Sequence, residues 1–89
     1  MSLTGTFKNI KVTMEAKYKD GDILCADGNI NYDGNIYLWS ARESHYGMGY
    51  DVEVKDNGKI PSKDLEFISA AIRTSIEENI VETTYKIKV

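Results

Sequence analysis

The sequence predicts an α+β fold: a single antiparallel sheet of about five strands, with one amphipathic helix packed on one face. Three observations predict it. Four stretches of alternating apolar and polar residues come first, one stretch of helical periodicity follows, and a fifth alternating stretch comes last. Asp-Gly pairs, which favour tight hairpins, separate the first three stretches. With 89 residues the chain has room for one domain, which we expect to span residues 1–89.

The first two predicted strands, residues 8–18 and 23–32, should form a hairpin. In both, the even positions are mainly apolar and the odd positions mainly polar, as in a strand with one buried face. The Asp20-Gly21 pair between them predicts a type I′ turn, because glycine accepts a positive φ. A second pair, Asp33-Gly34, predicts the turn into the third strand.

The third predicted strand, residues 35–41, is apolar on both faces over residues 36–39, which is typical of a strand that is central or covered on its second side. A connection over residues 42–47 leads to the fourth predicted strand, residues 48–55, which alternates cleanly. This strand could also serve as an exposed edge that accepts a strand from a partner.

A helix is predicted after Asn57-Gly58, with Ser62 as its N-cap, Asp64 as a favourable charge in the first turn and Asn79 at its end. Its apolar stripe has spacings of three and four residues and includes Leu65, Ile68, Ile72 and Ile76. The fifth strand, residues 81–89, alternates again.

The connections between these elements predict the topology. Short turns make the first four strands an antiparallel meander, and a helix that returns across one face brings the fifth strand antiparallel to the first. The predicted strand order is therefore 5-1-2-3-4. The face away from the helix should be broad and polar, with Asn9, Lys11, Thr13, Glu15, Lys17, Asp27, Asn29, Asn31, Glu82, Thr84, Lys86 and Lys88.

Composition excludes several classes of function. The net charge is −3 and basic residues do not cluster, so we expect no nucleic-acid binding. Cys25 is the only cysteine, which predicts a reducing, cytoplasmic setting without disulfides. The first residues do not resemble an export signal and no run of eighteen apolar residues occurs, so we expect no membrane association.

Polar residues recur at every second position from residue 27 to residue 33, as the oxygen ligands of a calcium loop do. Counting from Asp27 puts Tyr32 where that loop requires glycine, and counting from Asn29 puts Ser40 where it requires a bidentate glutamate. We therefore interpret these residues as the solvent side of a strand and expect no metal and no other cofactor.

The segment from residue 39 to residue 50 is the richest in recognition side chains. Tyr, Trp and Arg dominate binding hot spots, and loops held by rigid strands often carry function. The only histidine lies here, distant in sequence from the only cysteine, so no catalytic residues are assigned. The candidate binding residues are Trp39, Arg42, Glu43, His45, Tyr46 and Tyr50.

These observations favour a small, non-catalytic protein-interaction module of the inhibitor, immunity or adaptor type, of a kind that a phage or mobile element could encode. It would bind a protein partner through this segment and an adjoining edge or face of the sheet. One alternative is a small-molecule binder or small enzyme with a cleft between helix and sheet, where Tyr32, Tyr50 or Tyr85 points inward. Another is an accessory subunit of a larger assembly, and a homo-oligomer is compatible with each hypothesis.

Overall fold

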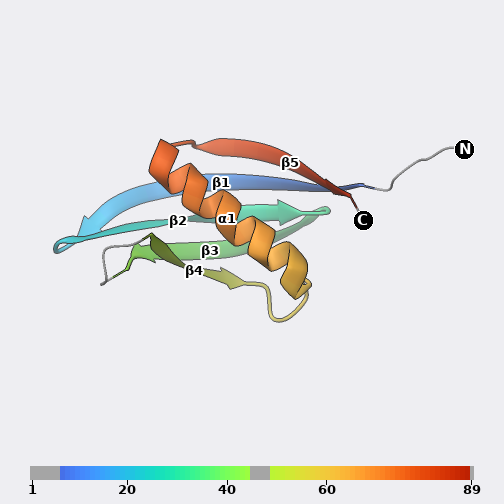
Figure 1. The fold of residues 1–89 in the computed structure, drawn as a ribbon, viewed down its shortest axis with the longest axis horizontal. Helices are drawn as coiled ribbons and strands as arrows, with labels where there is room; N and C mark the ends of the chain where they lie inside the picture. The colour runs from blue at the N-terminus through green and yellow to red at the C-terminus, as the bar shows by residue number, and fades with distance from the viewer. Residues whose placement is uncertain (1–6, 45–48, 89) are drawn as a thin grey trace, which may run out of the picture.

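The computed structural model describes residues 7–44 and 49–88. In chain order the elements are β1 (Phe7–Asp20), β2 (Ile23–Tyr32), β3 (Asn35–Glu43), β4 (Tyr50–Lys55), α1 (Ser62–Glu78) and β5 (Glu82–Lys88). All strand pairs are antiparallel, in the order β4-β3-β2-β1-β5 (Figure 1). The predicted α+β class and strand order are therefore confirmed.

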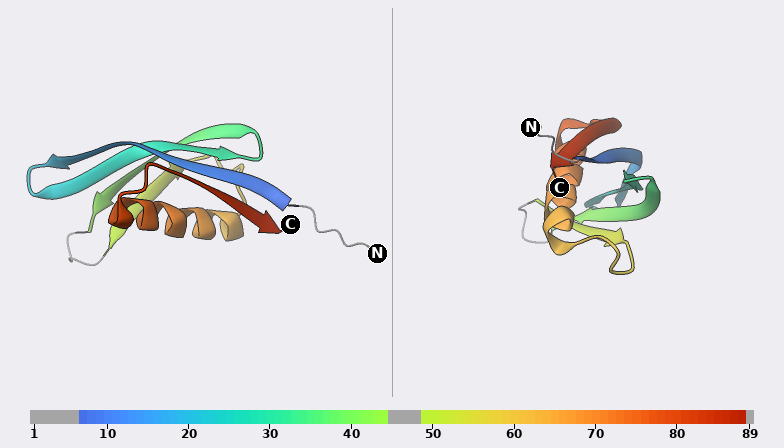
Figure 2. Two further views of the ribbon diagram at one scale, coloured as in Figure 1. Left: turned by 90° about the horizontal axis from the view of Figure 1, so that it is seen from above. Right: turned by 90° about the vertical axis from the view of Figure 1, so that its right-hand side faces the viewer.

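The sheet curves around α1, which crosses one face obliquely (Figures 1 and 2). We call this side of the sheet the inner face and the opposite side the outer face. The core between α1 and the inner face contains apolar side chains of no more than 1% exposure, among them Ile10, Val12, Ile30, Trp39, Ile68, Ile72 and Ile76. Among the described residues, no helix is both long and apolar enough to cross a membrane.

The polar ladder of β2 lies on the outer face, as the strand interpretation predicted. Asp27, Asn29 and Asn31 alternate with the buried Ala26, Gly28 and Ile30. The Oδ1 of Asn31 accepts a hydrogen bond from the backbone N–H of Gly34 at 3.0 Å, so this residue supports the β2–β3 turn.

The two hairpin turns differ from each other. Asp33 and Gly34, where the sequence predicted a turn, have φ values of 50° and 91°, as a type I′ turn requires at both central residues. In the first hairpin Asp20 pairs with Ile23, so the central residues are Gly21 and Asp22. Only Gly21 has a positive φ, at 67°, which fits a type II′ turn and corrects the predicted type I′.

A β-bulge at Glu15 reverses the alternation of β1. Met14 pairs with Gly28 and Ala16 pairs with Asp27, so Glu15 has no partner on β2. Beyond the bulge, Tyr18 lies on the outer face and is 50% exposed. Lys17 lies on the inner face, opposite Ala26. The predicted outward position of Lys17 and inward position of Tyr18 were wrong because an extra residue shifts every later side chain to the other face.

Trp39 and Gly28 pack together on the inner face, next to this bulge. They pair across β2 and β3, and the Trp39 Nε1 donates to the carbonyl oxygens of Thr13 and Asn29, both at 3.2 Å. The indole therefore spans β2 at Gly28 to reach β1. A Cβ atom on Gly28 would lie 1.9 Å from the Thr13 oxygen, so the backbone of β1 leaves room for glycine alone.

The ends of α1 are capped by different means. Pro61, not the predicted Ser62, is the N-cap, and no side chain caps this end; Ser62 is the first helical residue. Asp64 supplies the predicted acid in the first turn, and Asn79 ends the helix with φ 57° as predicted. Although the last turn holds no basic residue, the Lys17 Nζ donates to the Ile76 carbonyl at 2.9 Å. Lys17 thus places a positive charge at the negative end of the helix dipole.

Candidate functional site

The outer row of β3 carries two exposed apolar side chains. Ile36 is 67% exposed and Leu38 is 57% exposed, and Ser40 and Arg42 continue the same row. The sequence predicted a strand that is central or covered on its second side. β3 does lie between β2 and β4, but no described residue covers Ile36 or Leu38. These two neighbouring aliphatic side chains form a small exposed apolar patch.

A hollow adjoins this apolar patch on the outer face. Four residues lie side by side across β1 to β4, namely Tyr18, Cys25, Arg42 and Asp51. Ser40, the next outward residue of β3, lies beside Glu53 of β4. The hollow has a volume of about 380 Å³, and its lining consists of Tyr18, Asp20, Cys25, Ala26, Ser40, Ala41, Arg42, Asp51, Val52 and Glu53.

The charge around the hollow is predominantly negative. Asp20, Asp51 and Glu53 line it, while Arg42 is its only basic group. Although Arg42 pairs with Asp51 in the sheet register, no ion pair joins the two among the described side chains. Exposed acids beside an apolar patch suit a partner that contributes lysine or arginine together with aliphatic side chains.

The four sequence-predicted binding residues that the structure describes are divided between the two faces and the core. Trp39 is 1% exposed, so a partner cannot reach it. Arg42 and Glu43 belong to β3, not to a loop as predicted, and they point to opposite faces. Arg42 is exposed on the outer face, whereas the Glu43 Oε1 accepts the Leu24 N–H at 3.4 Å.

Tyr50 lies on the inner face, apart from Arg42. Tyr50 begins β4 opposite Glu43, and its carbonyl accepts a hydrogen bond from the Arg73 Nε at 3.1 Å. Burial raises the pKa of the Tyr50 phenol, and the nearby Glu43 and Glu77 add to this effect. His45 and Tyr46 lie outside the described residues.

Cys25 is half-buried in the hollow, where its Sγ lies 3.8 Å from the Ile23 carbonyl oxygen. This weak contact and the neighbouring apolar residues fit a small packed side chain. In residues 7–44 and 49–88, no group of three or more histidine, cysteine, aspartate or glutamate side chains is placed to hold a metal ion.

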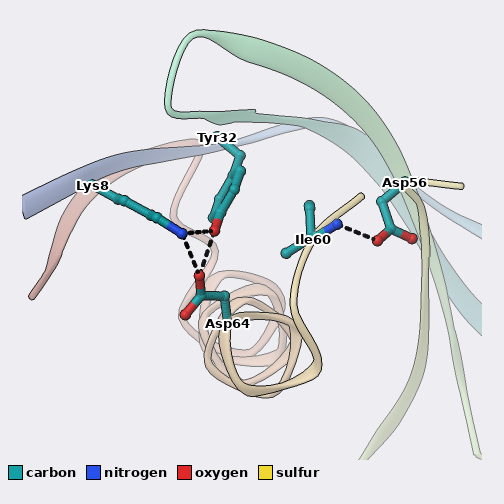
Figure 3. A network of polar contacts seen from close by, with 5 residues as sticks. All are labelled: Lys8, Tyr32, Asp56, Ile60 and Asp64. Carbon is teal, nitrogen blue, oxygen red and sulfur yellow. Dashed lines mark hydrogen bonds and ion pairs between the residues drawn. The ribbon is translucent and has the colours of Figure 1, made fainter. Parts of the chain in front are cut away.

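A second polar group lies on the inner face, where Lys8, Tyr32 and Asp64 join β1, β2 and α1 (Figure 3). The Tyr32 hydroxyl donates to Asp64, the Lys8 Nζ donates to that hydroxyl at 2.7 Å, and Lys8 lies 3.4 Å from Asp64. The hydroxyl that the cleft hypothesis assigned to a ligand is therefore already engaged. These contacts hold the first turn of α1 against the sheet. In the loop that leads from β4 to α1, the Asp56 carboxylate accepts the Ile60 N–H at 3.0 Å.

Stability should fall in acid because of Asp64. The Tyr32 hydrogen bond and the charge of Lys8 hold the pKa of this carboxyl below its usual value. A pKa that is lower in the folded state contributes stability above the unfolded value of 3.8, and this contribution is lost as the pH falls through the folded value. The stability advantage of wild type over Asp64→Asn should therefore be constant near neutral pH and shrink as the pH falls from about 5 to below 3 in urea unfolding.

Tyr32→Phe provides the matched comparison for this prediction. Removing the hydroxyl takes away one of the two side-chain hydrogen bonds that Asp64 accepts and leaves the one from Lys8. The pKa of the carboxyl should therefore return toward its usual value, and the acid-dependent part of the stability should diminish. Loss of a hydrogen bond to a charged group should also cost about 1.5–3 kcal/mol near neutral pH. A constant difference between wild type and Asp64→Asn across this pH range would contradict the assignment.

Comparisons with protein-family models, curated proteins and solved structures find no match for this chain. A function must therefore be argued from the chain's own surface. The apolar patch and the hollow are continuous along β3, and together we call them the docking face: Tyr18, Asp20, Ile36, Leu38, Arg42, Asp51 and Glu53.

Proposed function

We propose that this protein is a small, non-catalytic interaction module of the inhibitor, immunity or adaptor type, and that it binds a protein partner through the docking face. The observation that carries the proposal is the exposure of Ile36 and Leu38 beside the hollow. Their strand also presents Arg42, and Tyr18 stands on the far side of the hollow. Exposed apolar side chains with an arginine and a tyrosine are the usual anchors of a protein interface.

The charge of the docking face defines the chemistry of the partner. Three carboxylates line the hollow against one guanidinium, and the whole chain has a net charge of −3. A partner surface with a basic side chain at its centre would neutralise Asp51 and Glu53, and aliphatic groups beside it would cover Leu38. Such pairing accelerates association at low salt and weakens as salt screens the charges.

Affinity capture tests this proposal. The tagged chain should retain one stoichiometric, basic protein from a lysate of its source cells at moderate salt. Leu38→Asp should reduce its recovery at least tenfold, because an acid replaces an exposed apolar contact. Ala70→Asp is the matched control, since Ala70 is exposed on α1, on the other side of the sheet, and recovery should be unchanged.

Two results would argue against the docking face. If Leu38→Asp and wild type recover the same protein equally, the partner binds elsewhere on the molecule. If no protein is recovered at any salt concentration, the interaction hypothesis fails. Circular dichroism of both variants should match wild type, because both positions are exposed.

A further inference from the structure

β5 borders the sheet opposite β4 (Figure 1). It pairs with β1 along its whole length, from Phe7 opposite Lys88 to Thr13 opposite Glu82. Since β5 is the last strand in the order, the backbone groups on its other side meet no strand among the described residues. An open strand edge of this kind can accept another strand through backbone hydrogen bonds.

The side chains of β5 form two rows that differ in character. Glu82, Thr84 and Lys86 lie on the outer face and are exposed. Thr83, Tyr85 and Ile87 lie on the inner face and are half-buried. Val81, immediately before the strand, is 62% exposed although it is aliphatic.

We propose that β5 binds the β5 of a second copy of this chain, antiparallel, around a two-fold axis at Thr84. This register sets Glu82 of each copy opposite Lys86 of the other, and Thr84 opposite its own counterpart. Both pairings are favourable across strands: opposite charges attract, and threonine hydroxyls bond each other. A two-fold axis repeats each contact, so the charge pattern is self-complementary.

The inner row supports the same register. It places Val81 opposite Ile87 of the second copy, so an aliphatic side chain that is 62% exposed in one chain gains an aliphatic neighbour. Thr83 faces Tyr85 of the second copy. The Tyr85 ring meets the ring of Phe67 edge-on, with centroids 5.3 Å apart, and Phe67 is itself 41% exposed. Aromatic and aliphatic groups thus border the edge on its inner side.

β4, the strand at the opposite edge of the sheet, is less suited to pairing with a second copy of itself. The two antiparallel registers that overlap most of β4 have their two-fold axes at Val52 or Glu53. The first sets Asp51 against Glu53 of the second copy at two places. The second sets Asp51 against Lys55, which is favourable, but sets Glu53 against itself at the axis, where β5 has Thr84. Like charges directly opposite each other destabilise a strand pair, so charge favours self-pairing at β5 over β4.

This self-association is independent of the proposed partner. The docking face lies on the outer side of β1 to β4, whereas the contact between copies extends the sheet beyond β5. A dimer would therefore present two docking faces. The failure of one proposal leaves the other intact, because Leu38 and Lys86 lie on separate strands at separate places.

Sedimentation equilibrium of the full chain at about 0.15 M salt tests the proposal. Wild type should dimerise at concentrations below about 1 mM. In Lys86→Glu, two glutamates face each other at two places across the axis, and in Glu82→Lys two lysines do so. Each variant should therefore dimerise at least roughly tenfold more weakly than wild type. An equimolar mixture of these two variants restores opposite charges at both positions and should dimerise as wild type does.

Lys55→Glu on β4 is the matched control and should leave the dimer intact. The proposal is overturned if wild type is monomeric up to about 1 mM, if both β5 variants dimerise as wild type does, or if their mixture stays monomeric. It is also overturned if Lys55→Glu alone dissociates the dimer. Unchanged circular dichroism will establish that the variants are folded, since all three positions are exposed.

Discussion

Replacing Gly28 with alanine should lower the free energy of unfolding by about 3–5 kcal/mol, a large effect for the addition of one methyl group. The new Cβ would meet the Thr13 carbonyl oxygen at 1.9 Å and the Met14 Cα at 3.0 Å. Both are backbone atoms of β1, so no side-chain rotation can relieve the overlap. The strand must move, and movement of β1 would also break the bond between Trp39 and Thr13.

Urea unfolding of Gly28→Ala and Gly21→Ala will separate this overlap from the general cost of losing a glycine. Gly21 has a φ of 67° but nothing within 4 Å of a built Cβ, so alanine there should cost about 1–2 kcal/mol through backbone strain alone. If the two variants are equally stable, β1 can move away from Gly28 without loss, and the close approach does not matter to the fold.

Alternation and turn residues were sufficient to predict the sheet. β2 keeps a strict period of two between turns that contain Gly21 and Gly34, and the helical spacing of Ile68, Ile72 and Ile76 begins after Gly58. Each of these signals comes from residues that are close together in the chain, so it can be read from the sequence alone. The strand order then followed from the length and direction of the connections, which limit the possible topologies.

The bulge at Glu15 could not be predicted in the same way. Ala16 and Tyr18 continue the apolar even positions of β1, and an uninterrupted strand would account for them equally well. The bulge depends on contacts from distant segments. Met14 donates to the Val81 carbonyl at 2.8 Å, and Trp39 donates to Thr13. The position of Lys17 at the end of α1 was missed for the same reason.

The candidate site was predicted only in part. Arg42 lies on the docking face, whereas Trp39, which we also predicted to be a binding residue, lies in the core. A tryptophan on a two-sided apolar strand can face either way, and only the position of α1 decides which side is covered. For the same reason, Ile36 and Leu38 appeared to be covered and are exposed.

The bulge connects the core with the docking face. By shifting the later side chains of β1, it places Tyr18 on the outer face beside Cys25, where Tyr18 and Asp20 line the hollow. Without it, Tyr18 would point toward α1. The Trp39 indole supports the bulge from the inner side through Thr13, so a buried residue helps to determine the shape of the exposed surface.

Trp39→Ala should therefore cost about 3–5 kcal/mol of unfolding free energy, because it removes a large side chain that is 1% exposed. Trp39→Phe keeps much of the volume but leaves the Thr13 and Asn29 carbonyls without their donor, which should cost about 1–3 kcal/mol. Urea unfolding measures both values. If Trp39→Ala costs less than Trp39→Phe, or if neither change lowers stability, Trp39 does not stabilise the core and its role as a binding residue must be considered again.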